Sequence, residues 1–135
     1  MQKGKYPISQ ATPGGSLAIE TELDPALTKA DALSGSIASK EKILPEITEN
    51  IKIKYTLFEE VFGTGKHETV DKPKPNEILM LSLNTSITVG QVSKTYENAV
   101  DLTLKIPVVP LKGESIGIAR NLNGHWRLIG FGEII

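Results

Sequence analysis

Residues 113–135 read GESIGIARNLNGHWRLIGFGEII, and this stretch decides the fold. Apolar residues alternate on both sides of the dipeptide Asn123-Gly124, and Ile116 and Ile118 fall on one side of an extended chain. Asn-Gly favours a type I′ turn because both central residues of that turn need a positive φ. The pattern therefore predicts a β-hairpin whose turn fixes the register of its two arms.

The second arm of this hairpin has the composition of a closing strand. It contains the only tryptophan, Trp126, and the glycines Gly130 and Gly132. Glycine inside a strand usually marks a bulge, a barrel corner or a close backbone approach. We expect Trp126 to point into a small barrel, and in that case His125 and Arg127 point outward on the opposite face of the strand.

The segments before the hairpin predict more strands and no long helix. Alternation is clearest where Ile51, Ile53 and Tyr55 are separated by lysine residues. Six short segments of this kind bury one common face by curling into a closed ring. We therefore predict an all-β chain with a small antiparallel β-barrel of about six strands, preceded by the last strands of a second barrel. The predicted strands span residues 51–57, 77–84, 87–94, 100–106, 115–120 and 125–134.

The first part of the chain is less regular. Residues 1–12 are predicted to form a loop or a weakly held edge strand, followed by a turn at Pro13-Gly14-Gly15. Short strands are predicted at residues 17–21 and 32–39, where Leu17, Ile19, Leu33 and Ile37 are the inward residues. Between these strands Asp24 and Pro25 have the residue types of an N-cap and a first helical position, which predicts one helical turn over residues 24–29.

A charged linker marks the domain boundary. Residues 40–45 contain three charged residues, Lys40, Glu41 and Lys42, followed by Pro45. We place the boundary here, with domains at residues 1–42 and 43–135. A second charged segment, residues 63–76, is predicted to be a long loop.

Composition excludes several classes of protein. The chain of 135 residues has 15 basic and 16 acidic residues, so no global field attracts nucleic acid and any RNA contact is local. The absence of cysteine excludes disulfides, thiolate zinc sites and cysteine nucleophiles, and it favours the cytoplasm. No apolar run has the length of a signal peptide or approaches the roughly 18 residues of a membrane span, so we expect no membrane contact.

No catalytic or metal-binding motif is complete in this sequence. The glycine-rich residues 63–67, GTGKH, resemble part of a phosphate-binding loop. That loop requires a glycine at the position of Glu60 and a serine or threonine at the position of His67. His67 and His125 are the only histidines and form no ligand pair of metal-site spacing. No Gly-x-Ser-x-Gly elbow is present. We therefore expect no catalytic residue, no cofactor and no metal in this chain.

The only two arginines flank the predicted hairpin turn. Arg120 lies on the first arm and Arg127 on the second, with His125 near the turn. The ordinary interpretation is cross-strand pairing with Glu114 or Glu133. The alternative is contact with an RNA phosphate or with an acidic group of a partner, which suits the bidentate guanidinium fork. Arg120, His125 and Arg127 are therefore the candidate contact residues.

Two segments resemble one known family. The run NGHWRLIGFGEI, with IGIAR before it, resembles the end of the gamma subunit of archaeal and eukaryotic translation initiation factor 2. Pro13-Gly14-Gly15 and residues 23–37, LDPALTKADALSGSI, resemble that family's passage from its second domain into its third. The resemblance extends from Pro13 to the last residue, although residues 63–76 are longer and richer in lysine than the family pattern.

The resemblance implies a fold, a function and partners. The family's gamma subunit has a GTPase domain followed by two β-barrels, and here the GTPase domain, with its GTP and magnesium, is absent. Residues 1–42 would be the end of the second barrel and residues 43–135 the third domain. The implied role is a non-catalytic scaffold and interaction module that supports delivery of initiator tRNA to the small ribosomal subunit, with the alpha and beta subunits as further partners. A split gene, a truncated form and a diverged paralogue remain open.

Two further hypotheses concern association. A free-standing β-barrel that binds a small ligand or a protein partner is the alternative function, and it needs an interior with a few convergent polar groups. A severed second barrel would leave Leu17, Ile19, Leu33 and Ile37 uncovered, so residues 1–42 are expected either to dock on the third domain or to pair with another copy. We favour self-association through residues 1–42.

Overall fold

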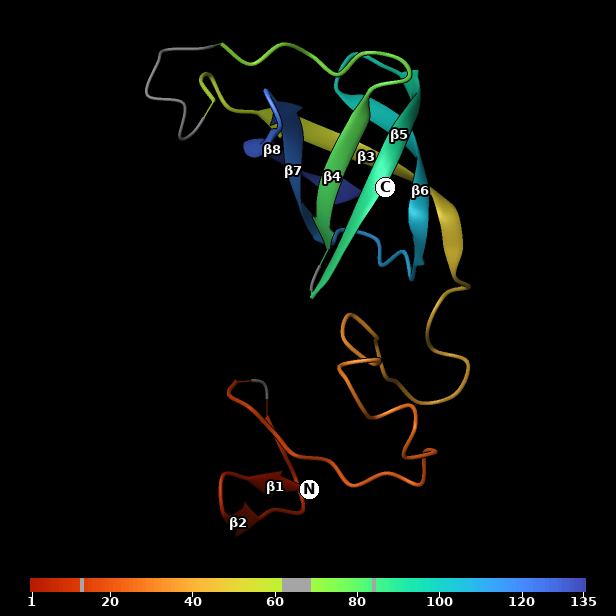
Figure 1. Cartoon of the computed structure of the whole chain (residues 1–135). Coiled ribbons are helices and arrows are strands. Elements are labelled where there is room, and N and C mark those ends of the chain that lie inside the picture. Colours follow the sequence, from red (N-terminus) through yellow and green to blue (C-terminus); the bar gives the residue numbers. More distant parts are fainter. Residues whose placement is uncertain (13, 62–68, 84) are drawn as a thin grey trace. The chain divides into compact units, whose positions relative to one another are not determined.

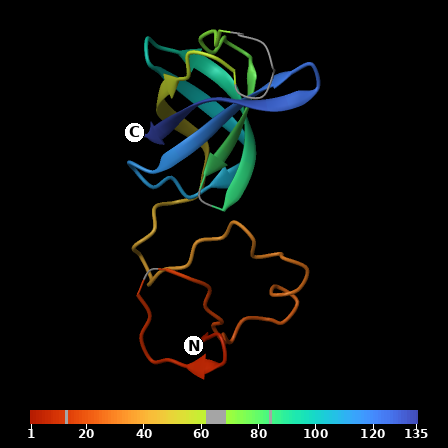
Figure 2. The ribbon, with the colours of Figure 1, turned by 90° about the vertical axis from the view of Figure 1, so that its left-hand side faces the viewer.

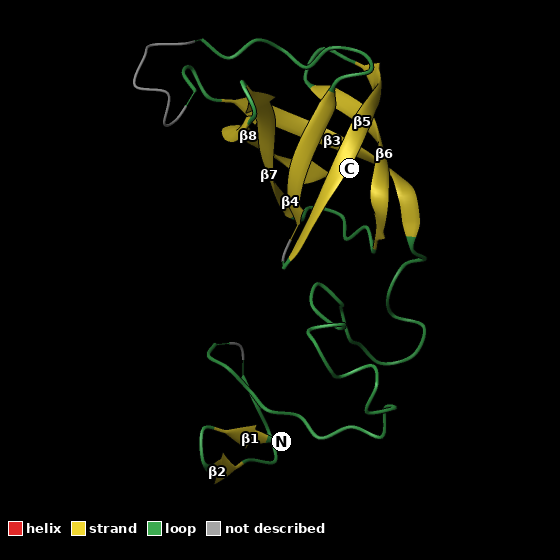
Figure 3. Cartoon of the chain, in the orientation of Figure 1, coloured by secondary structure: helices red, strands yellow, loops and turns green. Residues whose placement is uncertain are grey.

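The structure is a computed structural model that describes residues 1–12, 14–61, 69–83 and 85–135. These residues form strands and loops, and none of them lies in a helix (Figure 3). The prediction of an all-β chain is therefore confirmed. Contacts divide the chain into two compact units, Met1–Leu33 and Ser34–Ile135. The predicted domain boundary between residues 42 and 43 falls within the second unit and stays a prediction.

Six antiparallel strands of the second unit form a closed barrel (Figures 1 and 2). Their order around the ring is β3-β6-β5-β4-β7-β8, so the first and last of them close it. The six-stranded barrel predicted from the alternating segments is confirmed. The strands are β3 (Thr48–Leu57), β4 (Ile78–Leu83), β5 (Ser86–Thr95), β6 (Ala99–Val108), β7 (Ser115–Leu122) and β8 (His125–Ile134).

The β7–β8 hairpin has the predicted turn. Asn123 and Gly124 both have positive φ, 52° and 84°, as a type I′ turn requires. Leu122 is the Cα partner of His125, and the Gly124 N–H donates a hydrogen bond to Asn121 Oδ1 at 2.9 Å. The side chain of Asn121 thus satisfies a backbone donor inside the turn, which helps to hold the register.

Aliphatic side chains fill the inside of the barrel. Among the described residues, Thr88 is the only buried polar residue; its hydroxyl donates to the Ile106 carbonyl at 3.1 Å and accepts from the Ile106 N–H at 3.2 Å. No buried side-chain polar atom of the described residues lacks a hydrogen-bond partner, so these residues leave no polar group inside the barrel that would favour a ligand. The fully buried side chains are Ile53, Leu79, Leu81, Leu102, Ile116, Ile118, Ile129, Val92 and Val100, together with Thr88.

A bulge in β8 reverses the expected direction of Trp126. Ile118 pairs with Gly130, and the next residue of β7, Ala119, pairs with Leu128, so Ile129 is an extra residue in β8. One extra residue shifts the alternation to the opposite face of the strand. Trp126 therefore faces outward and is 38% exposed. The prediction that Trp126 points into the barrel, with Arg127 outside, is wrong.

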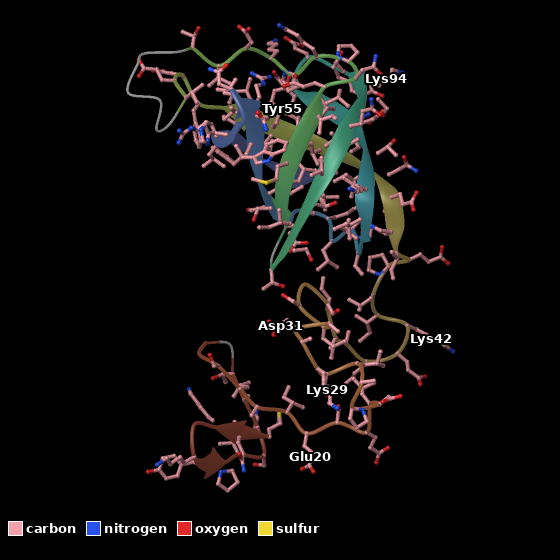
Figure 4. The ribbon with its side chains drawn as sticks, viewed as in Figure 1. Glu20, Lys29, Asp31, Lys42, Tyr55 and Lys94 are labelled. Carbon is pink, nitrogen blue, oxygen red and sulfur yellow. The ribbon has the colours of Figure 1, made fainter. Side chains whose placement is uncertain are left out.

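The buried side chain of Tyr55 is expected to make the barrel less stable at alkaline pH. Its side chain is buried near the upper part of the barrel (Figure 4), and its hydroxyl donates to the Glu97 carbonyl at 3.5 Å. Burial raises the pKa of the Tyr55 hydroxyl above its usual value because the interior disfavours the phenolate. The folded state thus retains this proton more strongly than the unfolded state does.

The resulting stability is present below the unfolded pKa and is lost as pH rises through the folded pKa. We expect the free energy of unfolding to fall above about pH 10 and the Tyr55→Phe variant to fall less steeply. Urea unfolding followed by circular dichroism at a series of alkaline pH values measures this difference. Tyr6→Phe, at an exposed tyrosine, is the control and should retain the parent's pH profile. Parallel curves for Tyr55→Phe and the parent would contradict the prediction.

The first unit contains little regular structure. It has a two-stranded sheet, β1 (Gln2–Lys3) and β2 (Tyr6–Pro7), and an isolated bridge between Gln2 and Ala18. The predicted strand at residues 17–21 is reduced to that bridge, and no strand forms at 32–39. An isolated segment gains no ladder hydrogen bonds without a neighbouring strand. The predictions of strands at residues 17–21 and 32–39 are therefore wrong, apart from the bridge at Ala18.

Asp24 caps a turn, as its sequence position indicates. The Ala26 N–H donates to Asp24 Oδ1 at 2.8 Å, and the Leu27 N–H donates to the Asp24 carbonyl at 2.9 Å. The turn does not continue into a helix, because one turn fixes several residues for a single backbone bond. Pro13, at the predicted turn before it, lies outside the described residues, whereas Gly14 and Gly15 have positive φ.

Residues 34–37 lie against one end of the barrel, which we call the lower end. Ser86, at the β4–β5 turn, donates from its hydroxyl to the Gly35 carbonyl at 2.9 Å. Gly35 has a φ of 80°, and a Cβ there would lie 2.4 Å from Ser86 Oγ. Ile37 is half-buried, whereas Leu17, Ile19 and Leu33 are exposed. Self-association through residues 1–42 stays a prediction.

Candidate binding surface at the β7–β8 hairpin

The structure brings two of the three candidate residues together. Arg120 of β7 and Arg127 of β8 are direct Cα partners in the antiparallel ladder, so their side chains share one face of the sheet. This face is the inward one, because Arg120 continues the alternation of Ile116 and Ile118. His125 is exposed beside the turn. Both arginines therefore lie on the part of the hairpin near its turn, at the end of the barrel away from the β4–β5 turn. We call this end, which is uppermost in Figure 1, the upper end.

Arg120 is paired with an acid that the sequence did not indicate. Its Nε donates to Glu77 Oε1, and its Nη2 donates to Glu77 Oε2 at 3.2 Å. The arginine and glutamate side chains are only 14% and 18% exposed. Glu77 Oε2 also accepts the Lys74 N–H at 2.8 Å. The bidentate pair therefore anchors the segment before β4 to β7.

The predicted pairing of Arg120 with Glu114 or Glu133 is wrong. Glu133 lies opposite Ser115, at the far end of the hairpin from Arg120, and Glu114 directly precedes that residue. The register of the hairpin thus places both acids out of reach. The sequence did not indicate the true partner, because Glu77 is 43 positions away from Arg120.

The side chains of Arg127 and His125 make no hydrogen bond or ion pair with any described residue. Like charges directly opposite each other in a ladder are destabilising, and the Glu77 carboxylate offsets only one of the two arginines. A net positive charge is left on this face of the hairpin. Such a position is suited to an external acceptor group.

A cavity of about 700 Å³ lies beside this ion pair. Residues 69–77 cross the upper end of the barrel and form one side of it (Figure 1). Lys74 and Asp71 form an exposed ion pair at 3.8 Å on that side. The described residues that line the cavity are Val61, Thr69, Asp71, Lys74, Pro75, Asn76, Glu77, Arg120 and Leu122.

The outer wall of the barrel over β5, β4, β7 and β8 is a second candidate surface. Cα pairing places Val89, Met80, Ala119 and Leu128 in one outward row across these four strands. Leu128 is 45% exposed. The next outward row is also uncharged and consists of Ile87, Ser82, Gly117 and Phe131. We call these eight residues the apolar wall.

In the part of the chain that the structure describes, no group of three or more His, Cys, Asp or Glu side chains is arranged to hold a metal ion. The glycine-rich residues 63–67, including His67, lie outside the described residues. No helix among the described residues is long and apolar enough to cross a membrane.

The fold and the surface together define a small, closed, antiparallel β-barrel with a packed interior and an arginine-bearing end. Residues 49–134 match the family model described as "Initiation factor eIF2 gamma, C terminal". The chain belongs to this family, as the resemblance of its C-terminal run indicated.

Curated relatives agree with this assignment. The chain is 42% identical to translation initiation factor 2 subunit gamma of Methanococcus maripaludis over 132 residues, which cover 98% of this chain and 32% of the relative. It is 39% identical over 128 residues to the Methanopyrus kandleri subunit (95% and 31%), and 40% identical over 127 residues to that of Archaeoglobus fulgidus (94% and 30%). The chain thus spans about a third of the length of the relatives it matches.

Proposed function

We propose that this chain is the non-catalytic C-terminal β-barrel part of an initiation factor 2 gamma subunit. In this role it is a scaffold and interaction module that supports delivery of initiator tRNA to the small ribosomal subunit. The family match and the similarity to gamma subunits along nearly the whole chain support the proposal. The alpha and beta subunits are further proposed partners, the cytoplasm is the proposed location, and GTP and magnesium are proposed to bind outside this chain.

The apolar wall is the observation that carries the scaffold role. Ile87 is 63% exposed, and Leu128 and Phe131 are also exposed on the same wall. Exposed apolar side chains that lie on one face in this way are typical of a site where another protein surface packs. The charged outward residues lie elsewhere, as with Lys52 and Asp101, which face each other across β3 and β6. The wall is therefore suited to packing against a neighbouring domain.

The alternative of a free-standing ligand-binding barrel is less well supported. A ligand barrel needs polar groups that converge on an internal cavity. Among the described residues the interior is aliphatic, and the hydrogen-bonding groups of Thr88 are already satisfied by Ile106. Binding through outer surfaces therefore agrees better with the structure than binding inside the barrel.

A chimeric gamma subunit tests the proposed function. The corresponding C-terminal third of the Methanococcus maripaludis subunit is replaced by this chain, and the factor is assembled with its alpha and beta subunits. Filter binding measures the affinity for methionylated initiator tRNA and its delivery to small ribosomal subunits. We expect both to stay within about threefold of the parent factor, because a barrel with the same contact surfaces preserves the binding free energy.

A variant of the chimera tests the apolar wall. Leu128→Asp introduces a charge where we propose that another domain packs, so delivery should fall at least about tenfold. Thr103→Asp, on the exposed face of β6, is the matched control and should leave delivery unchanged. Circular dichroism establishes that both variants fold. Full delivery by the Leu128→Asp chimera would exclude the wall as a packing surface, and loss of delivery by the unmodified chimera would overturn the proposed function.

A further inference from the structure

We propose that the cavity at the upper end of the barrel receives an acidic side chain of a protein partner, held by Arg120, which lines the cavity, and by Arg127, which lies opposite Arg120 in the β7–β8 ladder. This inference rests on the interaction-module part of the proposed function and specifies the chemistry of one contact. It follows from the free donors of the two arginines, the charge balance around them and the apolar lining of the cavity.

The unused hydrogen-bonding capacity at this site consists mainly of donors. The Glu77 carboxylate already accepts two bonds from Arg120 and one from the Lys74 backbone. A guanidinium has five N–H donors, so Arg120 retains three, and Arg127 uses none with the described residues. The ligand that complements this site therefore supplies acceptors in a planar, bidentate arrangement, as a carboxylate does.

The charge balance also favours an anion. Asp71 and Lys74 form their own exposed ion pair at 3.8 Å, and such a pair contributes little to its surroundings. Glu77 offsets Arg120. The charged side chains among the described lining residues are thus paired, and Arg127, directly opposite Arg120 in the ladder, adds a positive charge that forms no ion pair with a described residue. A bound carboxylate would relieve the repulsion between the two guanidinium groups as well as form new hydrogen bonds.

The lining of the cavity favours a protein acid over an RNA phosphate. Val61, Pro75 and Leu122 form apolar parts of its surface. A glutamate side chain can bury its methylene groups against such residues, whereas a phosphate cannot. Single-stranded RNA also favours exposed aromatic side chains for base stacking, and Trp126 faces away from the cavity, on the opposite face of β8. The concave, partly apolar site therefore fits an acidic side chain of a peptide.

The test is a titration of the isotope-labelled chain followed by NMR. The probe is the peptide acetyl-Leu-Glu-Leu-amide, and acetyl-Leu-Gln-Leu-amide is its uncharged control. We expect saturable shifts of the backbone signals of Leu122, Asn76 and Arg127 with the glutamate peptide, and at least about tenfold weaker binding of the glutamine peptide, since charge-assisted hydrogen bonds are roughly twice as strong as neutral ones.

Two variants locate the binding. Arg127→Gln should weaken binding of the glutamate peptide at least about tenfold, because it removes the unpaired guanidinium. Lys54→Gln removes the same charge from the exposed face of β3 and should change the affinity by less than about twofold, since exposed charges are screened by salt. Circular dichroism and the dispersion of the NMR spectrum establish that both variants are folded.

Three results would overturn the inference. They are the absence of saturable shifts, equal binding of the two peptides, and stronger shifts of the same signals by inorganic phosphate or by a short oligouridylate than by the glutamate peptide. The last result would assign the site to a phosphate. Because this titration uses the chain alone, its outcome is independent of tRNA delivery by the chimera, so either proposal can fail separately.

Discussion

Replacement of Gly130 by alanine is expected to open the barrel at its closing seam. A Cβ at this position would lie 2.4 Å from the Thr56 carbonyl oxygen and 3.0 Å from the Leu57 Cα. Both atoms belong to the backbone of β3, so no side-chain rotation relieves the overlap. We expect the free energy of unfolding to fall by about 3 kcal/mol or more, at the upper end of the cost of overpacking. Urea unfolding followed by circular dichroism measures the loss.

Gly117→Ala is the matched control for this substitution. A Cβ at Gly117 would meet the side chains of Ser82 and Leu128 at 3.6 and 3.7 Å, which are ordinary contact distances. Its stability should stay within about 0.5 kcal/mol of the parent, as for most surface substitutions. If Gly130→Ala were as stable as Gly117→Ala, the close approach of β8 to β3 would be wrong.

Ile53→Ala is expected to have the second large effect. Ile53 is 0% exposed, and its Cα partners are Val100 of β6 and Ile134 of β8. Removal of its side chain leaves a cavity at the centre of a packed core. We expect a loss of about 2–5 kcal/mol in the free energy of unfolding, measured by urea denaturation.

Ile87→Ala is the control for this truncation. It removes the same atoms from a side chain that is 63% exposed on the apolar wall. The expected loss is within about 0.5 kcal/mol for the isolated chain. Equal destabilisation by the two substitutions would contradict the assignment of Ile53 to the core and of Ile87 to the outer surface.

Local sequence patterns predicted most of the barrel. Alternation places Ile51, Ile53 and Tyr55 inside, and these three residues are buried. The turn at Asn123-Gly124 was predictable because its backbone conformation depends on those two residues alone. Both signals are local, so a single sequence contains them in full. The number of strands follows from repetition of the same signal.

The direction of Trp126 could not be predicted because one bulge reverses it. Alternation counted back from Ile134 would place Trp126 inside, but the extra residue Ile129 shifts the pattern. The position of a bulge depends on how β8 fits against β7 and β3, and no local pattern specifies it. The glycines of β8 indicated an irregularity without indicating its effect on the faces of the strand.

Contacts between residues far apart in sequence could not be predicted either. The carboxylate that holds Arg120 comes from Glu77 in another part of the chain, so the arginine pair could be noted in the sequence but its neutralisation could not. The partners of backbone hydrogen bonds between strands could not be predicted for the same reason. Residues 17–21 alternate like a strand, yet only Ala18 has a bridging partner, Gln2. Periodicity predicts which face would be buried, and it does not supply the neighbour that buries it.

Closure of the ring by β3 and β8 imposes an order on folding during synthesis. β3 leaves the ribosome first, but its second neighbour is β8, which is made last of the six strands. A nascent chain that has not yet reached His125 can form at most an open five-stranded sheet, with β3 and β7 as its free edges. Open edges recruit other chains, and the closing pair joins residues far apart in sequence, which slows folding. When the last strand, His125–Ile134, pairs with both β3 and β7, it therefore removes the open edges of this intermediate.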